Sequence, residues 1–256
     1  MRRSTVAALL SLLAGCAGRQ AAPAPAAVAP RAASEQDAIR KVVEEVVAFS
    51  AAGRLDSDEA RQLLTGEALA RWKTRTLGPI AGRASKITLV RNDFAVARVT
   101  ASAGSEKKDF YFYATRSSAW KVSAMRTLAV GMAYEAREQL RAQQNIPDRE
   151  ARLKNLDLTL STDEQLGTWF SDHHSDLDAI VKTEDEAKRA ELCRSLGIST
   201  VRFESGRSVT FTIGGILDNS VGFLYLVAPE APPQIDPGEY IWVEQIAVDW
   251  YLFRTT

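Results

Sequence analysis

The chain has 256 residues, and its 32 Lys and Arg balance 32 Asp and Glu, so the formal net charge is zero. No basic block indicates a nucleic-acid partner. No apolar run approaches the roughly 20 residues that a membrane-spanning helix needs. The length suits one large domain or two small ones.

The first sixteen residues have the form of a secretory signal, with a basic start, a short apolar middle and small residues before Cys16. The segment Leu13–Cys16 resembles the lipobox of bacterial lipoproteins. The resemblance implies signal-peptide cleavage between Gly15 and Cys16, lipid transfer to the Cys16 thiol and acylation of the new amino end. Because Ala17 rather than Asp follows, it also implies the periplasmic face of the outer membrane. The alternative is an ordinary secretory signal that contains a cysteine.

Residues 16–34 are expected to be the lipidated cysteine and a Pro/Ala tether, which cannot build a core. Removal of residues 1–15 leaves 30 basic against 32 acidic residues. With lipid on Cys16, Cys193 is the one remaining cysteine, so no internal disulfide can form. Cys193 lies in a helix-like stretch, which favours a buried apolar role over a reactive thiol.

Residues 35–130 are expected to form an α+β domain. Ser34 begins a capping box, and the helix behind it has one apolar face: Ile39, Val42, Val43, Val46 and Val47. Two short helices are expected at 58–64 and 66–76. Four segments rich in β-branched and aromatic residues, joined by short turns, predict an antiparallel meander at 86–90, 94–101, 108–115 and 119–126. This order of elements resembles the NTF2-like (cystatin-like) fold, in which a long helix packs in the hollow of a curved sheet.

Residues 131–160 are expected to form a helical connector, with a helix from 133 to 145 that Pro147 ends. Residues 161–256 then repeat the order of helices before strands. A capping signal at Ser161–Glu164 opens a helix to Lys182, and a second helix from 184 to 196 stops at Gly197. Strands are expected at 200–204, 208–213, 220–227, 239–244 and 248–254.

The predicted fold class is therefore α+β, with two small domains that each place helices before an antiparallel sheet. Three segments of the second half, Leu160–Glu164, Gly222–Leu226 and Asp249–Phe253, resemble uncharacterised bacterial envelope proteins. That resemblance implies no activity.

The segment Asp172–Asp176 contains both histidines of the chain, and His and Asp are ligand types for a divalent metal. Adjacent helical residues point about 100° apart, so His173 and His174 cannot easily share one ion. We therefore expect no metal site and no cofactor, and a half-buried packing role for His173. An interface or pH-sensing role is the alternative.

No nucleophile elbow or phosphate-binding loop occurs in the sequence, and we expect no enzyme activity. The alternative is a carboxylate base in an NTF2-like pocket, because some relatives of that fold are isomerases or cyclases with an Asp in an apolar cavity. Asp93 and Asp109 are the acids in or beside the first expected sheet. Asp93 is expected in a turn and Asp109 at a strand start.

The expected strand at 108–115 carries four consecutive aromatic residues, Phe110–Tyr113. By strand alternation the two phenylalanines face one side, and Tyr111 and Tyr113 face the other. The tyrosine pair forms a partly wet sheet face, or it lines a ligand hollow or a partner surface.

The loop 228–238 contains four prolines, among them Pro232 and Pro233. We expect a stiff, exposed hairpin connection. Rigid exposed loops bind at low entropic cost, so Pro232 and Pro233 are candidate partner-surface residues.

The sequence thus predicts a lipid-anchored cell-envelope protein with a non-enzymatic binding or scaffolding role. Its partners are the membrane, through the lipid, and an envelope protein. The alternative is small-ligand binding or carboxylate-assisted isomerase or hydrolase activity in an NTF2-like pocket. A third interpretation is a protein that only spaces or decorates the envelope. A deep cavity behind the tyrosines with a buried acid favours the alternative, whereas a filled interior with an exposed apolar patch favours partner binding.

Overall fold

The computed structural model describes residues 29–72, 80–103, 106–204, 206–216, 219–227 and 230–256. The expected signal peptide with Gly15 and Cys16, and the tether up to residue 28, lie outside these ranges. So do positions 73–76 of the third expected helix. Within the described ranges the chain forms two antiparallel sheets with helices packed on them, which confirms the α+β prediction.

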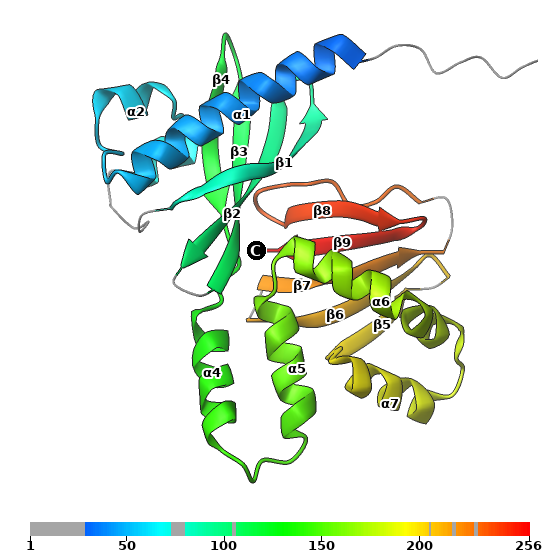
Figure 1. Ribbon diagram of the computed structural model, residues 1–256. Coiled ribbons are helices and arrows are strands. Elements are labelled where there is room, and N and C mark those ends of the chain that lie inside the picture. The colour runs from blue at the N-terminus through cyan, green and yellow to red at the C-terminus, as the bar shows by residue number, and fades with distance from the viewer. Residues whose placement is uncertain (1–28, 73–79, 104–105, 205, 217–218, 228–229) are drawn as a thin grey trace, which may run out of the picture.

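The helix α1 (Ala29–Ala51) lies across the first sheet, as Figure 1 shows. All five residues of its expected apolar face are buried. The prediction that Ser34 caps this helix is wrong, because α1 begins five residues earlier. Pro30 is tolerated in a first helical turn, and the alanines that follow it favour helix. The helix therefore begins before the capping signal at Ser34.

The first sheet is the expected meander, with each strand paired to the next in the chain. Two short helices, α2 (Asp58–Gln62) and α3 (Gly66–Trp72), precede it. Its strands are β1 (Gly82–Arg91), β2 (Phe94–Ala103), β3 (Glu106–Arg116) and β4 (Trp120–Arg126). The expected alternation along β3 is confirmed, because Phe110 and Phe112 pack with α1 whereas Tyr111 and Tyr113 belong to a different cluster.

The expected connector is a hairpin of two helices, α4 (Gly131–Ala142) and α5 (Arg149–Leu160), visible at the bottom of Figure 1. Arg149 holds the two together by donating from Nε to the carbonyl oxygens of Leu140 and Gln143, both at 2.9 Å. Apolar residues from both ends of the hairpin are buried in the core of the second sheet. The ends of this segment therefore pack against the second sheet, and Arg137 of α4 also donates to Glu106 of β3 at 2.7 Å, so the segment contacts both sheets.

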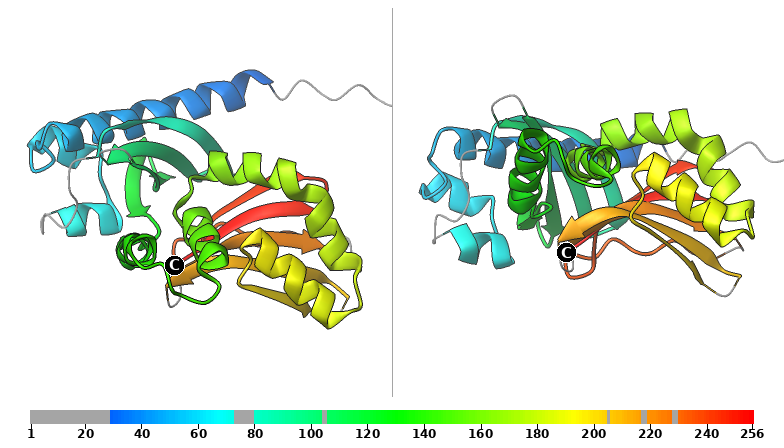
Figure 2. Two further views of the ribbon diagram at one scale, coloured as in Figure 1. Left: turned by 60° about the horizontal axis from the view of Figure 1, so that its bottom comes forward. Right: turned by 90° about the horizontal axis from the view of Figure 1, so that it is seen from below.

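The helices of the C-terminal half begin and end where the sequence signals them. Thr162 caps α6 (Asp163–Lys182) in a capping box with Gln165. Asp185 caps α7 (Glu186–Leu196), and Gly197 ends it with a φ of 78°, a left-handed conformation that favours glycine. Both helices lie over one face of the second sheet (Figure 2).

The second sheet contains β5 (Thr200–Glu204), β6 (Ser208–Ile216), β7 (Asn219–Leu226), β8 (Tyr240–Ala247) and β9 (Trp250–Thr255). Its order is β5-β6-β7-β9-β8. The prediction that loop 228–238 joins a hairpin is wrong, because β9 inserts between β7 and β8. The strand β8 therefore lies at the outer edge of the sheet.

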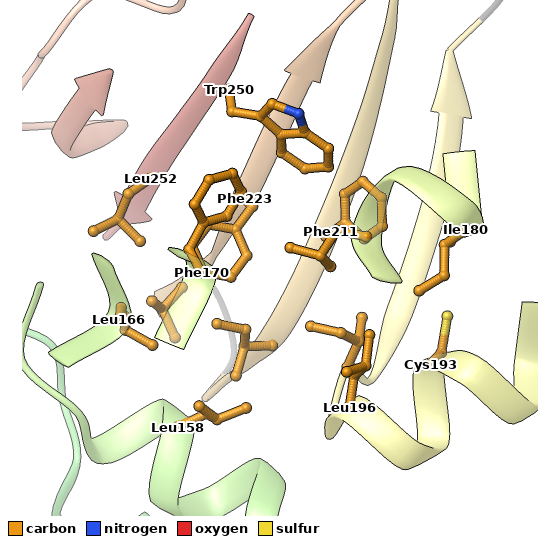
Figure 3. Packing of buried hydrophobic residues seen from close by; sticks show 14 of the residues in the cluster. Leu158, Leu166, Phe170, Ile180, Cys193, Leu196, Phe211, Phe223, Trp250 and Leu252 are labelled. Carbon is orange, nitrogen blue, oxygen red and sulfur yellow. The ribbon is translucent and has the colours of Figure 1, made fainter. Parts of the chain in front are cut away.

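Each half has a core of its own. Figure 3 shows the second core, where Phe170 and Leu166 of α6 pack against Phe211, Phe223 and other sheet residues. A third cluster contains side chains from both halves: Phe94, Val96, Tyr111, Tyr113, Ala124, Ile235, Ile241 and Trp242. We call residues 29–126 the first unit and residues 127–256 the second unit. Their contact is thus a packed apolar interface.

Among the helices in the described ranges, none is both long enough and apolar enough to cross a membrane.

Candidate functional site

Charged side chains meet where the two units touch. This ionic cluster contains residues of both sheets and of α6: Lys86, Arg98, Asp109, Tyr111, Asp163, Glu244 and Arg254. At its centre is Asp163, whose side chain is 0% exposed. The capping box at the start of α6 places it there, in the first turn of the helix.

The Asp163 carboxylate accepts hydrogen bonds from both units. Arg254 of β9 donates from Nε to Oδ1 at 2.7 Å, and the Tyr111 hydroxyl of β3 donates to Oδ2 at 2.8 Å. Arg98 Nη1 lies 3.4 Å from Oδ2. Arg254 also donates from Nη2 to the Ser161 carbonyl at 2.7 Å. A buried carboxylate with this many partners is compensated. The loss of any one partner leaves its desolvation penalty without compensation.

Asp109 lies beside this centre, within β3 rather than at its start. Its Oδ1 accepts from the Thr100 hydroxyl at 2.6 Å, and its Oδ2 accepts from the backbone N–H of Asp163 at 2.7 Å. Burial, and secondarily the charge of Asp163, raise the pKa of Asp109 above its ordinary value. Burial likewise raises the pKa of Tyr111 well above 10.

A second arm of the cluster runs toward the edge strand β8. Glu244 accepts from the Arg98 guanidinium at 3.2 Å and from the Trp242 indole N–H at 3.0 Å, and it also pairs with Lys86. The Arg98 guanidinium lies 5.8 Å from the Trp242 ring centroid. This arm therefore ties two strands of the first sheet to the edge of the second.

The interior behind the tyrosine pair is filled. Trp242 packs against Tyr111 with ring centroids 5.3 Å apart, and the Tyr113 hydroxyl donates to the Ile241 carbonyl at 2.8 Å. Tyr111 and Tyr113 are both 0% exposed. The prediction that they form a wet face, a ligand hollow or an open partner surface is wrong, because the second unit covers them. Asp109 is also buried, at 5% exposure.

The proline-rich loop is partly held by the same interface. Ile235 is buried in the shared apolar cluster, and the Pro237 carbonyl accepts from Arg126 Nε at 3.2 Å. Pro232 and Pro233 are half-buried. The expectation of a fully exposed loop is therefore wrong near its end, and a partner surface at the two prolines stays a prediction.

The other sequence-predicted positions are dispersed. His173 is half-buried and stacks on Trp169 with centroids 4.5 Å apart, as expected for packing, while His174 lies over Phe170. No group of three or more metal-ligating side chains occurs among the described residues. Asp93 is exposed in the β1–β2 turn, as expected.

An open groove lies away from the interface, between the end of α4, α5, α7 and the start of β5. Its volume is about 760 Å³. Apolar side chains form much of its lining: Leu156, Ala190, Cys193, Ile198 and Val201. Burial raises the pKa of the Cys193 thiol, and Figure 3 shows this side chain pointing toward Ile180 of α6. Cys193 thus has the buried apolar role that the sequence favoured.

Hydrogen bonds at one end of the groove fix its walls. Asn155 of α5 donates to the carbonyl oxygens of Gly197 (2.8 Å) and Ile213. Lys154 Nζ donates to the Ser195 carbonyl at 2.6 Å. Gly214 permits α5 to approach β6, because a Cβ at that position would lie 2.2 Å from the Thr159 hydroxyl oxygen. The groove is therefore preformed by the packing of α5 on the sheet.

Three arginines line the same groove, Arg152 of α5 and Arg189 and Arg194 of α7, with Asp148 and Glu186 as the acids. Sequence reasoning missed this site. Its lining comes from segments up to about 60 positions apart, each an ordinary polar helix or strand start, so only the packing of α5 against α7 brings them together.

No protein family model matches this chain, and neither a curated protein nor a solved structure is significantly similar to it. The resemblances to bacterial lipoproteins, to the NTF2-like fold and to envelope proteins therefore stay predictions.

Proposed function

We propose that this chain is a lipid-anchored cell-envelope protein with a non-enzymatic binding role, and that the groove between α5, α7 and β5 is its binding site. The lipobox-like segment ending in Cys16 supports the anchor, and the Pro/Ala tether supports a body held off the lipid surface. Its expected place is the periplasmic face of the outer membrane.

One observation carries the binding role, namely the contrast in hydrogen-bond use between the two polar sites. In the ionic cluster, Asp109 and Asp163 have protein donors on both carboxylate oxygens and are at most 5% exposed. In the groove, the side chains of Arg152 and Arg194 are exposed, and neither forms a hydrogen bond or an ion pair with another described residue. Concave sites with an apolar lining and a few unsatisfied polar groups are the usual form of ligand sites.

The raised pKa of Asp109 favours the alternative, carboxylate-assisted chemistry, since catalytic acids have such shifts. A general base must reach its substrate within hydrogen-bond distance. Trp242 and Ile241 fill the space in front of the β3 tyrosines, and both oxygens of Asp109 are engaged. We therefore prefer binding at the groove to catalysis at the interface.

The anchor is tested by expressing the full chain in a bacterium with two membranes. We expect the wild-type protein in the outer-membrane fraction, with mass spectrometry giving an acylated N-terminal peptide that begins at Cys16. Cys16→Ser should be uncut or released. Cys193→Ser is the matched control, because it removes the other cysteine and should leave the protein anchored. A wild-type protein in the soluble fraction with an unmodified N-terminus would contradict the proposal.

A further inference from the structure

The groove has the size and lining of a small-molecule site. Its volume of about 760 Å³ lies within the range of ligand pockets, about 300–1,000 Å³. The apolar stretch from Leu156 to Val201 offers contact to an aliphatic or aromatic body, and Ala190 on α7 leaves space where a larger side chain would project. An apolar ligand portion is therefore favoured along this lining.

The charges at the groove favour an anionic head. Arg152, Arg189 and Arg194 line it, against the two acids Asp148 and Glu186. Both acids are exposed at the starts of α5 and α7. Neither Arg152 nor Arg194 is in an ion pair with another of the described residues within 4.0 Å. Guanidinium groups with free donors bind carboxylates and phosphates in a fork geometry.

The Arg189 guanidinium is held by two contacts with residues outside the groove lining. Its Nη2 donates to the Thr183 carbonyl at 2.6 Å, and its guanidinium carbon lies 4.4 Å from the Phe203 ring centroid. Its Nε is buried and has no hydrogen-bond partner in the part of the chain that the structure describes. An unpaired buried donor is costly, so an acceptor that reaches it gains more than one at a solvated arginine.

A protein strand is a poorer occupant of this place. β5 is a free sheet edge beside the groove, which could pair with an extended peptide. However, it has only five residues, with exposed Arg202 and Glu204 among them. Short, charged edge strands are the usual protection against such pairing.

We propose that the groove binds an amphiphile with one anionic headgroup, a carboxylate or a phosphate, on an aliphatic chain. The headgroup contacts Arg189 with Arg194 or Arg152, and the chain lies along the lining from Leu156 to Val201. This inference rests on the assignment of the groove as the binding site, and it does not depend on the lipid anchor.

The test uses the full chain with Cys16→Ser, which is independent of lipidation. Calorimetric titration is carried out with dodecanoate and with dodecyl phosphate, below micelle formation. Dodecyltrimethylammonium and inorganic phosphate are the controls. We expect one-to-one binding of one or both anionic amphiphiles, and the tighter of the two identifies the headgroup. Absence of binding, or equal binding of the cationic amphiphile, overturns the proposal.

Two matched pairs of variants locate the site. Arg189→Gln should weaken binding about tenfold or more, as expected for loss of a charge-assisted hydrogen bond, while Lys188→Gln, one position along α7, should bind like the parent. Ala190→Trp should block the groove, while Ala187→Trp, which is exposed on the same helix outside the lining, should not. Circular dichroism checks folding.

If Arg189→Gln does not fold, the tryptophan pair decides. Binding that survives Ala190→Trp unchanged places the ligand elsewhere and overturns the proposal. Failure of this proposal leaves acylated Cys16 untouched, and an unmodified Cys16 leaves the titrations untouched, so the two failures are distinguishable.

Discussion

The ionic cluster and the groove both place arginines beside apolar side chains, but they use their hydrogen-bonding capacity differently. At Asp163 both oxygens have protein donors from the first and second units. At Arg189 a buried donor has no partner among the described residues. A cluster of charges is therefore not by itself a functional site. What distinguishes a binding surface is capacity that the chain does not fill.

The two places also differ in what surrounds them. The cluster lies beside an apolar interface of large rings, where Trp242 packs against Tyr111. The groove opens to solvent between α5 and α7. Buried ion pairs contribute little net stability but penalise wrong arrangements, so we interpret the cluster as the feature that fixes how the units dock.

The largest expected effect follows from breaking the centre of the cluster. Asp163→Ala leaves the Arg254 guanidinium, 4% exposed, without its carboxylate, and should lower the free energy of unfolding by about 3–5 kcal/mol. Urea denaturation followed by tryptophan fluorescence measures it. Asp172→Ala, on the exposed side of the same helix, should stay within about 0.5 kcal/mol. Equal effects for the two variants would refute a structural role for the cluster.

A smaller loss is expected where one hydrogen bond joins the units. Tyr113→Phe removes the hydroxyl that donates to the Ile241 carbonyl across the interface and should cost about 1–3 kcal/mol by the same denaturation. Tyr251→Phe is the control, since its hydroxyl has no hydrogen bond to another described residue. A Tyr113→Phe protein as stable as the parent would show that this hydrogen bond does not stabilise the interface.

The pH dependence of stability isolates Asp109. Its pKa in the folded protein is raised above 3.8 by burial and then by the Asp163 charge, so the folded state holds this proton more tightly than the unfolded chain. The stabilisation is complete below about pH 4 and is lost as pH rises through the raised pKa. The stability of Asp109→Asn relative to wild type should therefore increase between about pH 4 and pH 7. A flat or falling difference in unfolding free energy would mean that the partners of Asp109 lower its pKa instead.

The smallest effect is expected at the groove. Arg194 is exposed and in no ion pair with the described residues, so Arg194→Gln should change the unfolding free energy by less than about 0.5 kcal/mol. Thermal denaturation at one pH is sufficient. A loss comparable with that of Asp163→Ala would show that the groove arginines are structural, and the contrast between the two sites would fail.

The sequence predicted those parts of the fold that depend on local pattern. The 3.6-residue period from Ile39 to Val47 gave the buried face of α1, and short turns gave the first meander. The start of α1 was misplaced, because the helix propensity of the preceding alanines outweighs one capping signal at Ser34. The place of β9 between β7 and β8 was missed, because a long loop fixes no pairing.

The sites depended on contacts that no local pattern encodes. Alternation correctly separated Tyr111 and Tyr113 from the phenylalanines, yet it could not show that Trp242, about 130 residues later, covers them. The sequence pattern indicates only that Asp163 belongs to a helix start, because its partner Arg254 lies 91 residues away. In the groove, Arg152 and Arg189 meet only through the docking of α5 on α7.

The interface between the units is closed by protein contacts, whereas the groove is open to a ligand. Hydrogen–deuterium exchange of the Cys16→Ser chain, with and without the tighter of the two anionic amphiphiles, tests this contrast directly. We predict added protection in peptides covering 151–156 and 189–201, with peptides 109–113 and 241–244 slow and unchanged in both samples. Protection gained at 109–113 and 241–244, with none at the groove, would place the binding site at the interface instead.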